Sequence, residues 1–260
     1  MLRYALPAGL AALGTSAGAQ RLAYDLESPA PAEAAAPAEA PGGSAEASEG
    51  NPPWLQYALL DRLEWNFARG EDGYAWDFSA LVGGDRNRVY LASTGEGGAS
   101  LRLDYAELDA YYSRALGGDW DLNFGTRYDL RPRPNHAYAA LGAQYDGDRL
   151  WLGAWTYLSH KGELSARLSG YYNLTLTGPL VLQPSFELDA SARDVPALGL
   201  GHGFTYAELG LRLRYEIRPH LAPYVGASWS RDLGRTARLT RAAGDDPEAK
   251  SLVAGVRSEF

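Results

Sequence analysis

Charged residues that recur at every second position are the feature of this sequence with the clearest chemical consequence. In residues 207–217, Glu208, Arg212 and Arg214 alternate with leucine and tyrosine. Successive side chains of an extended strand point to opposite faces, so these charges share one face and the apolar residues share the other. Such a face could pass a cation from carboxylate to carboxylate. Alternatively, its carboxylates could pair with its arginines and fill the space they enclose.

The cost of placing arginine in lipid decides which face looks outward. An arginine on the lipid face of a membrane barrel costs about 2–4 kcal/mol near the bilayer midplane. The opposite register puts Leu209, Leu211, Leu213 and Tyr215 on lipid without that cost. A water-soluble barrel would use the reverse arrangement, with its apolar residues inside. The leucine face therefore predicts a membrane barrel whose lumen is charged.

The same alternation assigns further charged residues to the predicted lumen. Acids outnumber bases among them, which favours cations in the lumen. A barrel of eight strands is filled by side chains and one of sixteen leaves open water, so a barrel of intermediate size leaves both a paired, closed lumen and a conducting path open. The predicted lumen-lining residues are Arg62, Glu64, Asp77, Glu107, Asp109, Arg127, Asp129, Arg167, Glu187, Asp189, Glu208, Arg212, Arg214, Glu216 and Arg257.

Runs in which apolar and polar residues alternate recur from Trp54 to Phe260. The length of each run is close to the roughly 9–11 residues that a tilted membrane strand requires. They predict an all-β, antiparallel transmembrane barrel of about twelve strands, an even number that leaves both chain ends on the periplasmic side. Tight turns should alternate with looser outer links. The expected turns are 84–87, 117–119, 146–148, 177–179 and 218–220, and the expected links include 95–103, 130–136, 190–203 and 233–249.

The N-terminal part of the chain reads as a targeting segment followed by a polar arm. A charged residue, an apolar stretch and the small residues 17–19 predict a cleaved signal peptide over residues 1–19. Residues 20–53 are rich in Ala, Pro and Glu and predict a disordered periplasmic arm. The barrel is expected over residues 54–260, in the outer membrane of a bacterium with lipid around it. The net charge of −8 disfavours nucleic acid as a partner.

The aromatic residues leave one orientation undecided. Trp151, Trp155 and Tyr157 share one face of a strand that carries no charge to identify the face. They could narrow the bore from inside, or pack against lipid or a neighbouring strand. Other tryptophans fit the girdles of aromatic side chains at the membrane interfaces, namely Trp54, Trp65, Trp76, Trp120 and Trp229.

The barrel sequence resembles the copper-resistance outer-membrane protein B family over roughly residues 55–260. The resemblance is clearest in Ala207-Glu208-Leu209-Gly210-Leu211-Arg212-Leu213-Arg214-Tyr215-Glu216-Ile217-Arg218, continued by Ala222-Pro223-Tyr224-Val225-Gly226. It also rests on shorter stretches elsewhere in the chain. These are residues 59–65, 75–77, 83–85, 88–91, 95–96, 159–163, 165–168, 182–184 and 252–257.

The resemblance implies an outer-membrane barrel that takes part in copper tolerance, beside a periplasmic multicopper oxidase. Family members often carry a Met- and His-rich arm before the barrel, but the arm of this chain has neither residue. The sequence holds no cysteine, and its one methionine is Met1. Cu(I) prefers soft sulfur ligands, so a copper ion bound by the mature chain would rest on imidazole, carboxylate or backbone oxygen, which suit Cu(II).

Three histidines are expected near the outer rim. His136, His160 and His202 could together form a copper site if their loops fold together, and the alternative is that they are solvated loop residues. His220 falls in a periplasmic turn. The acidic group Asp245, Asp246 and Glu248 in the last outer link could bind a divalent cation weakly, or could simply be solvated.

Two other functions compete with copper tolerance. The first is a general channel for small solutes or cations, without copper specificity. The second is an outer-membrane hydrolase, which needs a nucleophile and base within hydrogen-bonding reach. Ser159 and His160 are adjacent, so on a strand their side chains point to opposite faces and cannot form that pair. We therefore expect a protein without enzymatic activity.

Overall fold

The protein is a closed β-barrel in the computed structural model, which describes residues 54–68, 71–218 and 220–260. The predicted signal peptide (1–19) and the whole of the predicted arm (20–53) lie outside these described residues. Within the described residues, no helix is long and apolar enough to cross a membrane.

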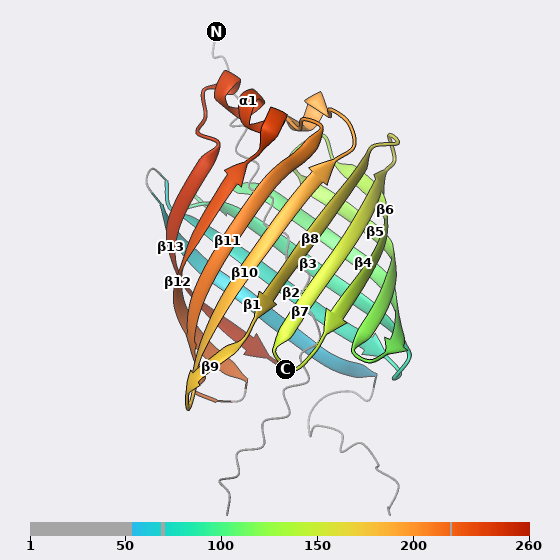
Figure 1. Ribbon diagram of the computed structural model, residues 1–260, viewed down its shortest axis with the longest axis vertical. Helices are drawn as coiled ribbons and strands as arrows, with labels where there is room; N and C mark the ends of the chain where they lie inside the picture. The colour runs from blue at the N-terminus through green and yellow to red at the C-terminus, as the bar shows by residue number, and fades with distance from the viewer. Residues whose placement is uncertain (1–53, 69–70, 219) are drawn as a thin grey trace, which may run out of the picture.

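The strands follow one another around the barrel, with one short helix and one 3-10 turn between them (Figure 1). The elements are β1 (Leu55–Ala68), β2 (Gly73–Gly83), β3 (Asn87–Gly98), β4 (Leu103–Gly117), β5 (Trp120–Arg131), β6 (His136–Asp146), β7 (Leu150–Ser159), β8 (Leu164–Tyr172), β9 (Leu174–Thr177), β10 (Leu180–Ser191), η1 (Pro196–Leu198), β11 (Gly203–Tyr215), β12 (Leu221–Asp232), α1 (Gly234–Ala243) and β13 (Glu248–Glu259).

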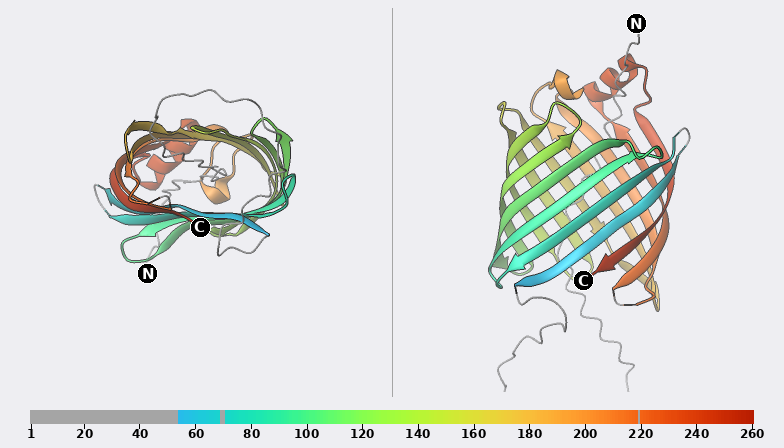
Figure 2. Two further views of the ribbon diagram at one scale, coloured as in Figure 1. Left: turned by 90° about the horizontal axis from the view of Figure 1, so that it is seen from below. Right: turned by 180° about the vertical axis from the view of Figure 1, so that it is seen from behind.

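Closure comes from the pairing of the first strand with the last. β1 pairs antiparallel with β13, from Leu59 opposite Glu259 to Ala68 opposite Ser251. β8 and β9 both pair with β10 and are separated only by Asn173, so they occupy one position in the barrel. The thirteen strands therefore form a twelve-membered ring, as the sequence predicted. Viewed along its axis, the ring is oval (Figure 2).

The two ends of the barrel differ. One end, here the turn end, carries the short connections and the C-terminus; the other, the loop end, carries η1 and α1 (Figure 1). This alternation of turns and longer links was predicted, but two details were not. The link expected at 95–103 is shorter, because β3 continues through glycines to Gly98 and glycines give no alternation of side chains to read. The link at 233–249 contains helix α1.

The side chains alternate between lipid and lumen as the cost of exposed arginine requires. On β11, Leu209 is 55% exposed whereas Arg212 and Arg214 are 8% and 3% exposed. The leucine face is therefore outside, as predicted. The candidate interface tryptophans also lie on the outer side, where none of them is buried. Outside is apolar and inside is polar, the pattern of a barrel that spans a membrane.

We expect Leu209→Arg, near the middle of β11, to lower the free energy of unfolding by about 2–4 kcal/mol, because it places a charge near the bilayer midplane. Tyr215→Arg is the matched control, since Tyr215 is also exposed but ends the strand. There an arginine should cost at most about 1 kcal/mol. Guanidinium titration in lipid vesicles, followed by tryptophan fluorescence, measures both. Equal losses would contradict the assigned membrane position of β11.

Candidate functional site

One side of the lumen is closed by packed aromatic rings. Tyr90 stacks on Tyr111, with 6.1 Å between ring centroids, and Tyr111 stacks on Trp155 at 4.6 Å. Together with Tyr138 and Tyr157, these rings form a buried cluster contributed by β3, β4, β6 and β7. A β-carbon at Gly142, opposite Trp155, would lie 2.2 Å from the indole, so only glycine leaves room for the ring.

The orientation left open by the sequence is thereby settled. Trp151, Trp155 and Tyr157 all face inward and are nearly fully buried. Trp151 stacks on Tyr171 of β8, with 5.6 Å between ring centroids. These side chains therefore narrow the bore and do not contact lipid.

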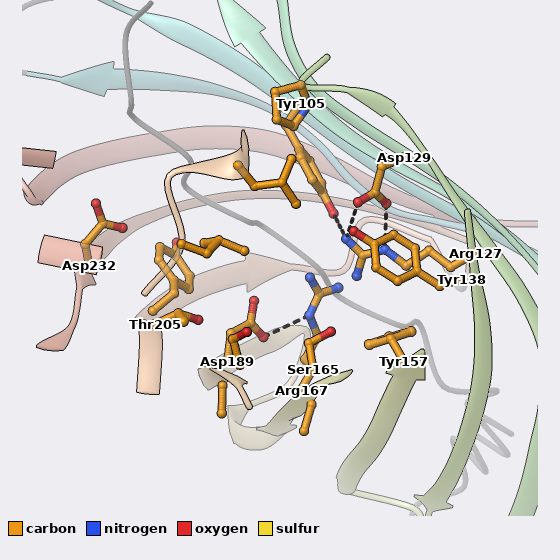
Figure 3. Close-up of a pocket in the computed structure, with 17 residues that line it drawn as sticks. Tyr105, Arg127, Asp129, Tyr138, Tyr157, Ser165, Arg167, Asp189, Thr205 and Asp232 are labelled. Atoms are coloured by element: carbon orange, nitrogen blue, oxygen red, sulfur yellow. Dashed lines mark hydrogen bonds and ion pairs between the residues drawn. The ribbon is translucent and has the colours of Figure 1, made fainter. Parts of the chain in front are cut away.

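The rest of the lumen holds paired charges, and the first cluster lies toward the loop end. The carboxylate of Glu107 on β4 forms ion pairs with two guanidinium groups. Its oxygens lie 2.8 Å from a nitrogen of Arg127 and 3.3 Å from a nitrogen of Arg167 on β8. Arg127 also pairs with Asp129 at 2.7 Å, and Arg167 with Asp189 at 3.1 Å. Arg167 thus joins β8 and β10 to β4 through the interior of the barrel. Figure 3 shows the guanidinium groups of the two arginines among the side chains that line one pocket.

A second cluster centres on Glu64 of β1. Both of its carboxylate oxygens accept hydrogen bonds from Arg212 of β11, each at 3.1 Å. The Tyr224 hydroxyl donates at 3.0 Å, and Arg62 lies 3.7 Å away. A bidentate arginine–carboxylate pair of this kind is strong and directional. Because β12 and β13 lie between β11 and β1 in the ring, this pair also crosses lumen space.

A third cluster lies toward the turn end. Arg257 pairs with Asp61 at 3.0 Å, and Arg214 donates to Asn173 at 2.9 Å. At the same end, Arg88 pairs with Asp121. The clusters together place ion pairs along much of the barrel interior, and they include most of the lumen residues predicted from the sequence.

The structure places nearly all of the predicted lumen set inside the barrel wall. Asp109 and Asp189 are only half-buried. Glu216 is half-buried too, but it follows the end of β11, which stops one residue earlier than the alternation suggested. The buried members are Arg62, Glu64, Asp77, Glu107, Arg127, Asp129, Arg167, Glu187, Glu208, Arg212, Arg214 and Arg257.

Sequence reasoning missed several acidic lumen residues, and two of them, Glu96 and Asp61, were missed for different reasons. Glu96 is in phase with Tyr90 and Thr94, which are buried on β3, so the alternation could have identified it. Asp61 could not be found in this way. The pairing of β1 with β2 shifts register between Leu60 and Arg62. Such a bulge turns two consecutive side chains, Asp61 and Arg62, toward one side.

Two hollows lie among these charges. A pocket of about 80 Å³ toward the loop end is lined by two arginines, Arg127 and Arg167, and by three aspartates, Asp129, Asp189 and Asp232. A smaller cavity of about 30 Å³ is lined by residues that include Arg62, Trp151, Tyr171 and Glu208. The larger pocket is lined by one more acid than base, and this balance favours a cation.

Several buried polar atoms have no hydrogen-bond partner within the described protein. Asp77 is fully buried, and neither of its carboxylate oxygens is bonded. The indole N–H of Trp151 and the hydroxyl of Tyr171 are in the same situation beside the smaller cavity. Buried polar groups are almost always hydrogen-bonded, so these atoms indicate that the lumen is a place for water or ions.

The structure brings together two of the three histidines predicted for the rim. His136 and His160 lie at the loop end on neighbouring strands, with 5.5 Å between ring centroids. His202 does not join them. It precedes β11 and pairs with Asp194 at 3.1 Å, and its hydrogen bonds hold the pKa of Asp194 below its usual value. A site shared by all three is therefore not formed, because the ring of strands separates β11 from β6 and β7.

The remaining candidate groups have ordinary partners. In residues 54–68, 71–218 and 220–260, no three His, Cys, Asp or Glu side chains are grouped so as to hold a metal ion. In the last outer link, Glu248 accepts hydrogen bonds from Trp229 at 3.0 Å and lies 2.6 Å from Lys250. The Ser159 hydroxyl donates to Glu163 at 2.7 Å, so its hydrogen bond goes to a carboxylate rather than to His160.

Comparison with known proteins adds a family and a fold. The family described as "Copper resistance protein B precursor" matches residues 54–260. The copper resistance protein B homolog of Pseudomonas syringae pv. tomato is 38% identical over 205 residues, which are 78% of this chain and 69% of that protein. Copper resistance protein B of Escherichia coli is 37% identical over 206 residues, 78% and 68% of the two chains.

A solved structure of the NanC porin has a TM-score of 0.54 to this chain. It is 13% identical, and the match covers 76% of this chain and 98% of that porin. At this level of identity the likeness shows a shared barrel fold.

We expect Arg167→Ala to raise the conductance of the barrel in a planar bilayer and to shift its reversal potential toward cations. The change removes the side chain that bridges the lumen and leaves Glu187 and Asp189 without their arginine. Breaking such a buried pair should also lower stability by about 3–5 kcal/mol, so folding is checked by heat-modified mobility on gels.

Arg102→Ala serves as the control for Arg167→Ala. It removes an exposed ion pair with Asp104 at the loop end, worth at most about 1 kcal/mol. Arg102→Ala should conduct as the unaltered barrel does. If folded Arg167→Ala barrels also keep the original conductance and reversal potential, Arg167 does not obstruct the path.

Proposed function

This chain belongs to the copper resistance protein B family, and on that premise we propose that it is an outer-membrane barrel that supports copper tolerance by binding copper ions and letting them pass along its lumen. In this proposal the loop end faces outward and the turn end faces the periplasm. The protein catalyses no reaction. A periplasmic multicopper oxidase is the proposed partner, since membership of the family implies one.

The observation that carries the proposal is a family match across the whole barrel, combined with a lumen in which carboxylates outnumber arginines. Asp77 and Glu96 are two further carboxyl groups on the lumen side of the strands. In a narrow space with low-dielectric walls, an excess of one sign of charge concentrates ions of the opposite sign. The lumen therefore suits cations.

The ligand types in the barrel favour Cu(II) over Cu(I). Residues 54–260 contain neither cysteine nor methionine, so no soft sulfur ligand faces the lumen. Carboxylate, phenol and imidazole groups are present, and these harder ligands suit Cu(II). The oxidation state of the cargo is thus part of the proposal and follows from the chemistry of the side chains.

A general cation channel is the second candidate. It is favoured by one observation: below the loop end, the described lumen offers carboxylates, guanidinium groups and aromatic rings but no histidine. Such a lumen selects for charge more than for copper. The two candidates differ in whether loss of the protein changes copper tolerance.

We expect the growth of a strain that lacks this protein to stop at a lower copper concentration than that of its parent. Expression of the full-length chain should restore copper tolerance. Asp77→Asn should restore it only in part, because it removes a buried carboxyl group from the lumen without changing side-chain size. Asp85→Asn is the matched control in an exposed turn and should restore growth fully. Copper content of the cells, measured by mass spectrometry, gives the direction of movement. Unchanged copper tolerance in the deletion strain would favour the general channel.

A further inference from the structure

We propose that His136 and His160 form a binding site for a divalent transition-metal cation at the loop-end mouth of the barrel. In the absence of the cation, the ammonium group of Lys161 holds its place, and Glu163 lies beside it. The choice of copper as the cation rests on the proposed function. The location of the site rests on the geometry of the mouth.

The fold brings the two imidazoles together. His136 begins β6 and His160 directly follows β7, and these neighbouring strands pair with Tyr138 opposite Ser159. The two ring centroids are 5.5 Å apart. Two imidazoles that bind one ion through nitrogens at about 2.0 Å, with a tetrahedral angle between them, have centroids about 5 Å apart. The rings are therefore already close to the separation that a shared ion requires.

His136 is prepared as a ligand. Its side chain is fully buried, and its Nδ1 lies 2.7 Å from the carbonyl oxygen of Pro134. A carbonyl only accepts, so Nδ1 carries the proton and Nε2 presents its lone pair. A backbone carbonyl that fixes the tautomer in this way is the usual outer-shell support of metal-binding histidines. The Tyr138 ring, with its centroid 6.1 Å away, supports the imidazole from one side.

A positive group already occupies the space in front of that lone pair. The Lys161 ammonium lies 3.2 Å from Nε2 of His136. A Glu163 carboxylate oxygen lies 3.8 Å from the same nitrogen and is held by the Ser159 hydroxyl at 2.7 Å. Lys161 is exposed and can swing outward. If a metal ion takes the place of the ammonium, the positive charge in front of Nε2 is kept. Glu163 then still has a cation beside it.

The ligand set selects the kind of cation. Imidazole nitrogens with a nearby carboxylate bind divalent copper, nickel and zinc, with copper strongest among them. Among the described residues no third His, Cys, Asp or Glu side chain, Glu163 included, is grouped with both imidazoles, so water completes the coordination. An incomplete protein shell makes the site exchangeable, as a site at the mouth of a conduit must be. Asp129 lies opposite His136 where the backbones of β5 and β6 pair, and its side chain lines the larger of the two pockets.

The test uses the purified full-length chain, without a histidine tag, titrated with Cu(II) in detergent. We expect one Cu(II) per barrel whose electron paramagnetic resonance spectrum shows coupling to two nitrogens. His160→Gln should reduce the coupling to one nitrogen and weaken Cu(II) binding by about tenfold or more. His160 is exposed, so this variant should fold. Lys161→Met should tighten binding, because it removes the competing ammonium.

His202→Gln and His220→Gln are the matched controls, and both should bind Cu(II) as the unaltered chain does. The proposal is overturned if His160→Gln keeps the two-nitrogen spectrum and the affinity of the unaltered chain, or if His202→Gln abolishes the spectrum. The outcome is separate from that of the growth experiment. A copper-sensitive deletion strain with unchanged Cu(II) binding by His160→Gln would keep the proposed function and reject this site. A lost signal without a growth defect would do the reverse.

Discussion

The structure depends on one constraint: every backbone N–H and C=O group that faces lipid must be hydrogen-bonded within the protein. The pairing of β1 with β13 meets this constraint by removing the free edges of the sheet. Closure then forces the alternation of side chains, because each strand has one face on lipid and one in the lumen. The outward face can be apolar throughout. The inward face must accommodate every charge that the strands carry.

The barrel accommodates these charges by dividing its interior. Aromatic rings from β3, β4, β6 and β7 fill one side and exclude water there. Ion pairs such as Arg167–Glu107 and Arg212–Glu64 occupy lumen space beyond this cluster and join strands that are not neighbours. Arg127 lies at the boundary, 4.9 Å from the ring centroid of Tyr157, where a cation–π contact links the two regions.

The division also bears on the proposed copper function, because residues 54–260 contain neither cysteine nor methionine. Selectivity in such a lumen arises from charge and from the geometry of nitrogen and oxygen ligands, not from soft coordination. The buried arginines pair with lumen carboxylates and hold them in place, while Asp77 has no bonded partner among the described residues. At the mouth, His136 and His160 add the only paired imidazoles of the described chain. In the proposed function and the proposed site, charge along the lumen and imidazole nitrogen at its mouth act together on a divalent cation.

The sequence alone determined the class, the number of strands, the outward leucine face, the order of turns and links, and most of the lumen charges. These features follow from the alternation of side chains along a strand, which is local covalent geometry and can be read without knowing the partners. Tertiary structure alone decided which charges pair across the lumen, that Trp151 faces inward, that a bulge turns Asp61 inside, and that His160 meets His136 while His202 does not. These depend on how strands are staggered when the ring closes, and a one-residue change in stagger or a single bulge alters them without any trace in the local alternation.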